Sequence, residues 1–402
     1  MHSQFTLLDS FLTQTQPFWR YEAFHACRAE VLPWGVHHPA LDQWLNSLSL
    51  QEIEEYKADP ERLTQILTQF FPSLAEIKRT MTVAKPPCMP SLPLPKHFDK
   101  GIPGRKWQQI EAMGKVLIAH HQGKQWLEWC SGKGYLGRVL ASVSQQPVVS
   151  FEYQAELCHS GQQEADALKL PMHFVQGDAF ANDSLNLFEP VTHAVALHAC
   201  GDLHVRMLQY ATSAGVEAIS FSPCCYHLTH DEHYQAMSSV AQNSTLKLTR
   251  QELRLPLQET VTGGERVKRH RQQEMIYRLG FDALLSHQLG FSSYVSVPSI
   301  QKSQLSLGFA AFCVWASKEK DISLDLECVD FAYFEHIGFQ RFWQMERVSL
   351  VQEGFRRLLE IWLVLDKALY LQENGYHVSV SEFCERQVTP RNLVVNAHRT
   401  KD

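Results

Sequence analysis

The sequence predicts an α/β fold: a Rossmann-like, doubly wound sheet with a helical N-terminal domain before it and a helix-rich insertion within it. Strand-like and helix-like segments alternate from residue 125 to residue 222, which indicates parallel strands joined by right-handed crossovers. A glycine-rich turn, "CSGKG", follows the first strand and precedes a helix. The first three strands each end at or next to a carboxylate. These observations indicate a ligand site at the carboxyl edge of the sheet.

The elements of this sheet follow one another along the chain. Apolar or alternating runs predict strands at residues 125–130, 147–152, 172–177, 192–199 and 216–222. Helical periodicity predicts helices between them at 134–143, 154–170 and 202–214. A long periodic helix at 350–374 ends before Gly375, a residue suited to the left-handed cap position. Segments 376–383 and 391–398 are expected to complete the sheet as an antiparallel pair.

The chain is expected to divide into a helical N-terminal domain at residues 1–85, a linker at 86–97 and an α/β domain at 98–402. The first segment shows helical periodicity and almost no alternation. The linker contains five prolines, which fix φ and remove donors, so it is predicted to be stiff and extended. Residues from about 228 to 342 are polar and irregular, and they are expected to form an insertion.

The composition is typical of a globular protein, with 45% hydrophobic residues, 20% charged residues and a net charge of −6. No apolar run approaches the roughly 20 residues of a membrane helix, so no membrane partner is expected. The N-terminus lacks the basic start and apolar core of a signal peptide. Ten cysteines without framework spacing suit a reducing compartment. A cytoplasmic location is therefore predicted.

The glycine turn is compatible with two classes of ligand. Gly132, Gly134 and Gly137 satisfy the G-x-G-x-x-G spacing of dinucleotide sites. The acidic strand ends favour S-adenosylmethionine instead. Glu128 closes the first strand, where a carboxylate suits the cationic amino and sulfonium end of that cofactor and would repel a pyrophosphate.

Two further carboxylates support the same cofactor. Glu152 ends the second strand, 24 residues after Glu128, where a carboxylate can accept from both ribose hydroxyls. Asp178 follows the third strand, where it can accept from the adenine amino group. Each residue alone is equally well explained as a solvated strand end. All three in this register favour S-adenosylmethionine.

Several motifs in the chain occur together: "WLEWCSGKGYLG", "ALHACGDL" and "SPCCYH", with "IPGR-x-W" upstream and "ENGYHVSV" and "TPRNLVV" near the end. This combination resembles a family of methyltransferase-like proteins with a Cys-Cys-Tyr/His signature. It is most similar to the members described as glutathione S-transferase C-terminal domain-containing. The resemblance covers about residues 100–227 and 350–398. It implies a class I methyltransferase fold, S-adenosylmethionine binding and distant relatives that methylate tRNA on a ribose hydroxyl.

The resemblance also implies a set of cofactor-binding residues: Glu128, Cys130, Gly132 and Gly134 at the amino-acid end, Glu152 at the ribose, and Asp178 with Ala179 at the adenine. Cys130 departs from the glycine that many methyltransferases have at this position. The N-terminal helices could correspond to a transferase-like helical domain, but they contain no matching motif, so the resemblance implies no glutathione binding.

The fourth and fifth strands end in "LHACGD" and "SPCCYH", the expected substrate side. Methyl transfer to a hydroxyl or ring nitrogen needs positioning and can need a general base. His198 is the candidate base, because imidazole titrates near neutrality, with a buried structural histidine as the alternative. Cys224 is a candidate nucleophile for methylation of a pyrimidine at carbon 5, although a free cysteine often simply packs. Tyr226 is predicted either to stack on a planar acceptor or to pack as a lid on its loop.

Thiols and imidazole are also the usual ligands of zinc, and Cys200, Cys224, Cys225 and His227 lie in these two motifs. Adjacent cysteines tend to point apart, however, and the sequence contains no C-x-x-C pair. No metal is therefore expected.

The one dense basic cluster runs from Arg266 to Arg271 in "GGERVKRHRQQ". It is predicted either to bind RNA phosphates or to form a solvated helix face. The sequence as a whole predicts an S-adenosylmethionine-dependent methyltransferase acting on RNA, either tRNA or rRNA. The alternatives are a methyltransferase for proteins or small molecules, and a scaffold that binds the cofactor without catalysis.

Overall fold

The computed structural model describes residues 1–29, 32, 34–35, 37–85, 89–258 and 264–400, so residues 86–88 of the expected linker lie outside the described residues. The chain forms two compact units. The sheet unit comprises Met1–Gln14, Glu76–Gln258 and Arg356–Asp402, and the helical unit comprises Thr15–Ala75 and Glu259–Phe355. This division differs from the expected boundary at 86–97, because both ends of the N-terminal segment group with the sheet.

Contacts of α1 (His2–Gln14) explain this difference. The Phe5 ring lies 5.3 Å from the ring of Trp362, and the Trp362 indole donates to Asp9 Oδ1 at 2.8 Å. Ser244 Oγ donates to the same Asp9 atom at 2.6 Å. The first helix therefore shares its core with the chain's C-terminal part, which sequence periodicity alone could not show.

The sheet unit contains a seven-stranded sheet in the order β3-β2-β1-β4-β5-β7-β6. Its strands are β1 Gln125–Trp129, β2 Val148–Glu152, β3 Met172–Gln176, β4 Thr192–Cys200, β5 Ala218–Cys224, β6 Tyr376–Glu382 and β7 Leu393–Arg399. The first five pair in parallel, whereas β7 is antiparallel to both β5 and β6. This topology confirms the predicted doubly wound fold and its antiparallel C-terminal pair.

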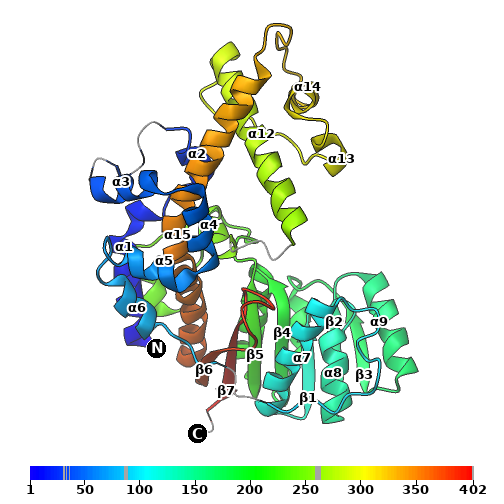
Figure 1. Ribbon diagram of the computed structural model, residues 1–402. Helices are drawn as coiled ribbons and strands as arrows, with labels where there is room; N and C mark the ends of the chain where they lie inside the picture. Colours follow the sequence, from blue (N-terminus) through cyan, green and yellow to red (C-terminus); the bar gives the residue numbers. More distant parts are fainter. Residues whose placement is uncertain (30–31, 33, 36, 86–88, 259–263, 401–402) are drawn as a thin grey trace. The chain divides into compact units, whose positions relative to one another are not determined.

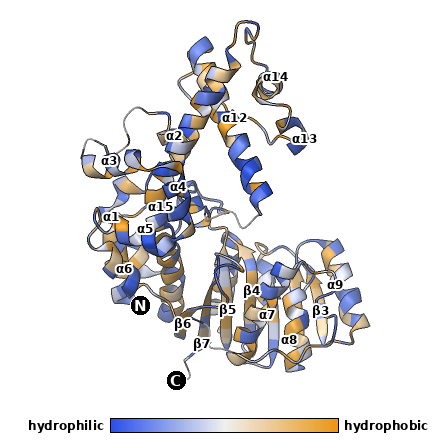
Figure 2. Ribbon diagram, in the orientation of Figure 1, coloured by the Kyte–Doolittle hydropathy of each residue, from blue (hydrophilic) through white to orange (hydrophobic). Residues whose placement is uncertain are grey.

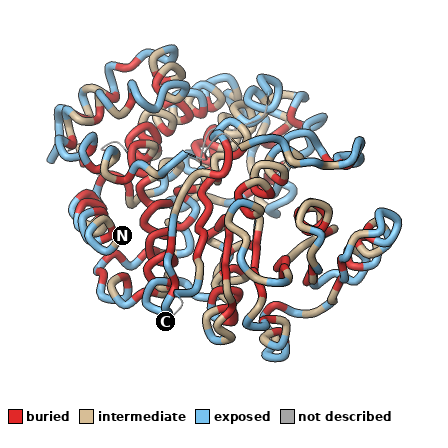
Figure 3. The backbone as a smooth tube through the Cα atoms, turned by 90° about the horizontal axis from the view of Figure 1, so that it is seen from below, coloured by how far each residue is buried: buried red, intermediate tan, exposed pale blue. Residues whose placement is uncertain are grey.

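Helices cover the two sides of the sheet in the manner that right-handed crossovers require. The helices α8 (Tyr135–Ser144) and α9 (Ala155–Ala167) pack on β1, β2 and β3, and α10 (Asp202–Ala214) packs on β4 and β5 (Figure 1). The strand order reverses between β1 and β4, and ligands of such sheets bind at the carboxyl ends of strands at that point. Figure 3 shows the strands largely buried, as expected of a sheet covered on both faces.

The core beside the first strands is apolar and closely packed. It includes Met113 and Leu117 of α7 (Gly104–Ala119), Trp126 of β1 and Val139 of α8, none of which is exposed. Helix α15 (Phe331–Glu373) starts earlier than the expected helix at 350–374. It ends before Gly375, whose φ of 82° is the left-handed conformation expected there.

The remaining described helices of the sheet unit are short: α6 Leu74–Thr80, which begins at the unit boundary, η2 Asn182–Leu187, α11 Ser239–Gln242 and η3 Glu252–Leu257. The helical unit contains η1 Gln16–Phe18, α2 Ala23–Ala26, α3 Pro39–Ser47, α4 Leu50–Ala58, α5 Pro60–Leu67, α12 Glu265–Leu289, α13 Lys302–Leu305, α14 Phe309–Glu319 and the first part of α15. Within the described ranges, no helix has the length and apolarity needed to cross a membrane.

An ionic contact joins three segments of the helical unit. Asp282 of α12 is 3% exposed, and it binds Arg28 at 2.8 Å and Arg341 at 3.0 Å. A buried carboxylate needs such partners, because an isolated charge in the protein interior is strongly unfavourable. Arg28 comes from the N-terminal part of the chain and Arg341 from α15, so this contact links sequence-distant parts of the unit.

Candidate active site

The turn after β1 has an unusual backbone. Cys130, Gly132 and Gly134 have φ values of 54°, 60° and 65°, all in the left-handed region. Glycine adopts this conformation without steric penalty, whereas a residue with a Cβ is disfavoured there. The structure thus shows what the departure at Cys130 means: a cysteine occupies a position whose backbone favours glycine. Gly134 is also the N-cap residue of α8.

Glu152 holds this turn from the end of β2. Its Oε2 accepts from the Gly132 backbone N–H at 2.9 Å, and its Oε1 accepts from the Gln154 N–H at 3.0 Å. The side chain is 8% exposed. A carboxylate offers about four lone-pair sites, so these two bonds leave acceptor capacity for hydroxyl donors of a ligand.

Glu128 has a different role from the one expected. Its Oε2 accepts from Ser150 Oγ at 2.7 Å, and the backbone N–H groups of Gly137 and Leu136 also point at the carboxylate. Only 4% of the residue is exposed. The carboxylate therefore caps the start of α8 from inside the protein, and direct contact with the amino end of a cofactor, as expected from sequence, does not fit this orientation.

Burial dominates the titration of this group. It raises the pKa of Glu128 to about 7, against the opposing effects of the hydrogen bonds from Ser150 and Gly137 and of the Arg138 charge. Near neutral pH the carboxyl therefore titrates between a neutral and a charged form inside the protein.

The three glycines of the turn are required for different reasons. A Cβ on Gly137 would lie 2.4 Å from Glu128 Oε2 and 2.9 Å from Ser150 Oγ. One on Gly134 would lie 2.4 Å from the Met172 side chain. One on Gly132 would meet no atom within 4 Å. Gly134 and Gly137 thus allow the helix and the strands to pack closely, whereas Gly132 borders open space that a ligand can occupy.

Asp178 and Ala179 follow β3 as expected. Asp178 is exposed and accepts from the Phe180 N–H at 2.9 Å, whereas Ala179 is 5% exposed. Two aromatic side chains that sequence reasoning missed stand beside them: Tyr153 is 69% exposed and Phe180 is 49% exposed. Each follows a candidate cofactor residue within two positions. Exposed rings at the ends of β2 and β3 are suited to packing against a planar base.

His198 lies on the exposed side of β4, where the register with β5 shifts between Leu197 and Cys200. Its φ is 72°, and its Nε2 lies 3.0 Å from Gln109 Oε1. Desolvation by neighbouring groups, together with the charges of Lys106 and Arg391, lowers the pKa of His198. The imidazole is therefore neutral near pH 7, the form that a general base needs.

Cys224 is buried at the end of β5, and its Sγ lies 3.2 Å from Cys200 Sγ. The hydrogen bonds with Cys200 and Cys225 and burial raise the pKa of Cys224, whereas the hydrogen bonds from Cys200 and Cys224 lower the pKa of Cys225. Thiolate character thus resides on Cys225 rather than on the predicted nucleophile. An activated nucleophilic cysteine has the opposite environment to that of Cys224.

Tyr226 is not placed to stack on a substrate. It is 3% exposed, its ring lies 6.5 Å from that of His204, and the Lys367 ammonium lies 5.7 Å from its centroid. The ring thus packs inside the sheet unit. Stacking on a planar acceptor does not fit this burial, and the ring contacts α10 and α15 rather than its own loop, so neither predicted role describes its place.

The basic segment forms the start of α12 in the helical unit. Arg266, Lys268, Arg269 and Arg271 are exposed and His270 is partly exposed. Lys268 pairs with Glu54 of α4. Figure 2 shows the first turns of α12 as hydrophilic. This part of the helix therefore presents several cations to solvent.

Comparison with known proteins is consistent with this site. Residues 105–232 match the family model described as "Methyltransferase domain". No curated protein matches the sequence. The matched region contains the turn after β1, the ends of β2 to β5 and the Cys-Cys-Tyr-His loop.

Solved structures similar to the chain include methyltransferases of several kinds. A Pyrococcus abyssi tRNA (uracil-54, C5)-methyltransferase has 16% identity and a TM-score of 0.25, over 29% of this chain and 28% of that chain. An Aquifex aeolicus SAM-dependent methyltransferase has 13% identity and a TM-score of 0.25, over 32% and 71%. The magnesium protoporphyrin IX methyltransferase of Synechocystis PCC 6803 has 10% identity and a TM-score of 0.32, over 84% and 100%. At these TM-scores, and with less than a third of the first protein's length spanned, the likenesses carry no conclusion about substrate.

The family match falls on the part of the chain that forms the carboxyl edge. Residues 105–232 match a methyltransferase domain, and they contribute β1 to β5 of a sheet with the strand order of a Rossmann-like fold. The residues at this edge that could hold a cofactor are Gly132, beside which a Cβ would meet no atom, the Glu152 carboxylate, and the exposed rings of Tyr153 and Phe180 at the ends of β2 and β3.

The glycines of the turn give a matched pair of variants. Gly137→Ala should destabilise the sheet unit by about 1–3 kcal/mol, because the new methyl overlaps Glu128. Gly132→Ala should cost only about 1 kcal/mol from its left-handed backbone, but it should weaken binding of S-adenosylhomocysteine at least about tenfold. Urea unfolding and calorimetric titration measure the two effects. Equal losses of stability in both variants would contradict the assigned roles.

The titration of Glu128 predicts a pH dependence of stability. Folding raises the pKa of Glu128 from 4.5 to about 7. The protonated carboxyl therefore stabilises the folded state fully below about pH 4.5, and this stabilisation is lost as the pH rises through 7. Relative to Glu128→Gln, the free energy of unfolding of the native protein should fall by about 3 kcal/mol between about pH 4.5 and 8. Urea unfolding of both proteins across this range checks it. Parallel pH profiles would show that folding does not raise the pKa of this carboxyl.

Proposed function

We propose that the protein transfers a methyl group from S-adenosylmethionine to RNA, with His198 as the group that accepts the proton of the acceptor. The observation that carries this proposal is the charge around His198. Lys106 and Arg391 are close enough to lower its pKa, and Lys106 is exposed. Cations beside an exposed imidazole favour a substrate that carries phosphates close to the reacting atom.

At the carboxyl edge, one set of residues would bind the cofactor and His198 would accept the proton of the substrate. The cofactor supplies a methyl group on a sulfonium, which is electrophilic without further activation. Glu152 and the turn at Gly132 would hold the ribose and amino-acid parts, and Tyr153 and Phe180 would pack against the adenine with Asp178 beside them. His198, neutral and oriented by Gln109 at 3.0 Å, would take a proton from a hydroxyl or ring nitrogen.

A second set of cations supports RNA over other anionic acceptors. The start of α12 exposes Arg266, Lys268, Arg269 and Arg271, four cationic side chains within six residues. Such a cluster suits a polyanion, whose binding weakens steeply with salt because counterions are released. The relationship to the glutathione S-transferase C-terminal domain-containing members of the Cys-Cys-Tyr/His family and the cytoplasmic location are further parts of this proposal.

Cofactor binding is tested at Glu152. Glu152→Ala should lower the affinity for S-adenosylhomocysteine about 100-fold, equivalent to about 3 kcal/mol from two lost charge-assisted hydrogen bonds. Glu152→Gln retains an acceptor for the Gly132 N–H and separates loss of the ligand bonds from loss of the turn. Glu156→Ala, an exposed carboxylate at the start of α9, is the matched control. Calorimetric affinities within twofold of the native value for Glu152→Ala would overturn the assignment of this site.

Substrate class is tested by transfer of labelled methyl groups into fractions from cells that lack the protein. Label should enter RNA, and His198→Ala should reduce the rate about 10²- to 10⁴-fold without changing cofactor affinity. Arg266→Ala with Arg269→Ala should reduce the slope of log affinity for RNA against log salt by about 1–2. Label in protein or small molecules would overturn the RNA substrate. Cofactor binding without label in any fraction would favour a non-catalytic scaffold.

A further inference from the structure

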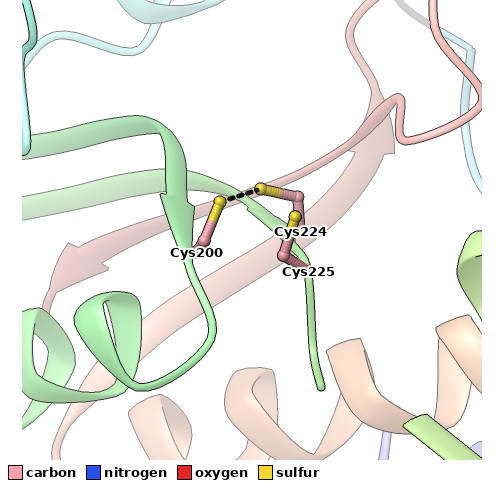
Figure 4. A group of neighbouring side chains, drawn as sticks. All are labelled: Cys200, Cys224 and Cys225. Atoms are coloured by element: carbon pink, nitrogen blue, oxygen red, sulfur yellow. Dashed lines mark hydrogen bonds between the residues drawn. The ribbon is translucent and has the colours of Figure 1, made fainter. Parts of the chain in front are cut away.

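Three thiols meet at the carboxyl edge of the sheet, between the ends of β4 and β5. The sulfur atoms of Cys200, Cys224 and Cys225 all lie within 4.8 Å of one another, and those of Cys200 and Cys224 are 3.2 Å apart. Figure 4 shows the sulfurs of Cys200 and Cys224 turned toward one another, with the Cys225 sulfur beside the Cys224 side chain. We propose that these three cysteines bind one zinc ion as thiolates, which the methyltransferase assignment does not require.

The sulfur positions agree with the size of such a site. Zinc–thiolate bonds are about 2.3 Å long, which places two sulfurs of a tetrahedral site about 3.8 Å apart. The Cys200–Cys224 separation of 3.2 Å is shorter than this value, and no pair of the three sulfurs is more than 4.8 Å apart. Small side-chain rotations therefore suffice to form the three bonds.

The backbone brings the sulfurs together where simple alternation would separate them. Cys225 has a φ of 47°, so its side chain does not continue the alternation of β5 and turns toward that of Cys224. The register shift in β4 after Leu197 sets the position of Cys200 opposite Cys224. Cys224 and Cys225 are adjacent in sequence, but because of these two irregularities their sulfurs lie close together and close to that of Cys200.

Backbone hydrogen bonds hold the two cysteine-bearing segments in place. The Gly201 N–H donates to the Cys224 carbonyl at 3.1 Å, and the Leu228 N–H donates to the Cys225 carbonyl at 2.9 Å. The Asp202 N–H donates to Leu228 O at 3.0 Å. A Cβ on Gly201 would lie 1.9 Å from that same oxygen, so only glycine allows this approach. These backbone contacts fix the positions of the two segments that carry the donor set.

The chemistry of the donors selects the ion. Thiolates bind soft or borderline ions, whereas magnesium and calcium take oxygen ligands. His227 follows Cys225 by two residues, and its Nδ1 is buried without a hydrogen-bond partner within the described part of the chain. An imidazole nitrogen is the other usual zinc ligand. Cys200 and Cys225 are only half-buried, so the ion can enter and a fourth ligand can reach it.

Zinc binding is measured on the full chain, reduced and freed of metal by chelation, with zinc and cobalt ions alone as probes. The native protein should bind one ion per chain, and cobalt should give the near-ultraviolet absorption of thiolate coordination. Cys200→Ser and Cys225→Ser should each weaken zinc binding at least about tenfold. Zinc should also raise the unfolding temperature, because the ion joins the ends of two strands.

Cys158→Ser is the matched control, because Cys158 is a buried thiol of the same unit that lies outside the cluster. It should leave zinc affinity unchanged. The measurement on the native protein does not depend on the variants folding: absence of cobalt–thiolate absorption in the reduced native chain would overturn the proposal. Retention of that absorption in a folded variant with all three cysteines changed to serine would also overturn it.

Discussion

The hydrogen bond from the Gly132 N–H to Glu152 joins the end of β2 to the turn after β1, and the geometry of the site depends on it. Two backbone hydrogen bonds support the same turn: the Ser131 N–H donates to Phe151 O of β2 at 2.9 Å, and the Gly134 N–H donates to Ser131 O at 2.9 Å. The second oxygen of the Glu152 carboxylate accepts from Gln154, which also fixes the start of α9. The Glu128 carboxylate accepts from backbone N–H groups in the first turn of α8, inside the protein. The carboxylates at the ends of β1 and β2 thus both bind the backbone of the segment between β1 and α8, Glu152 at Gly132 and Glu128 at the start of the helix.

Backbone strain is concentrated at the same edge. Cys130, His198 and Cys225 follow or interrupt β1, β4 and β5, and each has a positive φ despite carrying a Cβ. Each such residue costs roughly 1–2 kcal/mol. The regular pairing of the parallel strands provides the rigid surroundings that hold these conformations. The strain turns side chains out of the alternating pattern, and it thereby places an imidazole and two cysteines where a regular strand would not.

The sequence was sufficient for the fold because its signals are local and repeated. Alternating strands and helices, the glycine turn and the long helix before Gly375 each depend on periodicity or on a single backbone preference. The unit boundaries were not accessible in this way, since the place of α1 depends on Asp9 and Phe5 contacting Trp362, far along the chain. Burial of Tyr226 and the inward orientation of Glu128 likewise depend on tertiary neighbours. Tyr153 and Phe180 could have been found from sequence, because each lies within two residues of a candidate cofactor residue at a strand end.

The side chains at the carboxyl edge suit two different kinds of chemistry, proton transfer at His198 and metal binding at the cysteines. The cysteines share hydrogen bonds within a partly buried cluster, and the thiol predicted as a nucleophile has its pKa raised by that cluster. A pyrimidine C5 mechanism needs a free thiolate directed at the ring, and a sulfur held by two other thiols does not meet this need. His198 is exposed and neutral, and it is oriented by Gln109. Proton removal from a hydroxyl or ring nitrogen is therefore the chemistry that the exposed group can perform, and metal binding is the chemistry that suits the cysteines. The two roles are compatible because they use different atoms of the same edge.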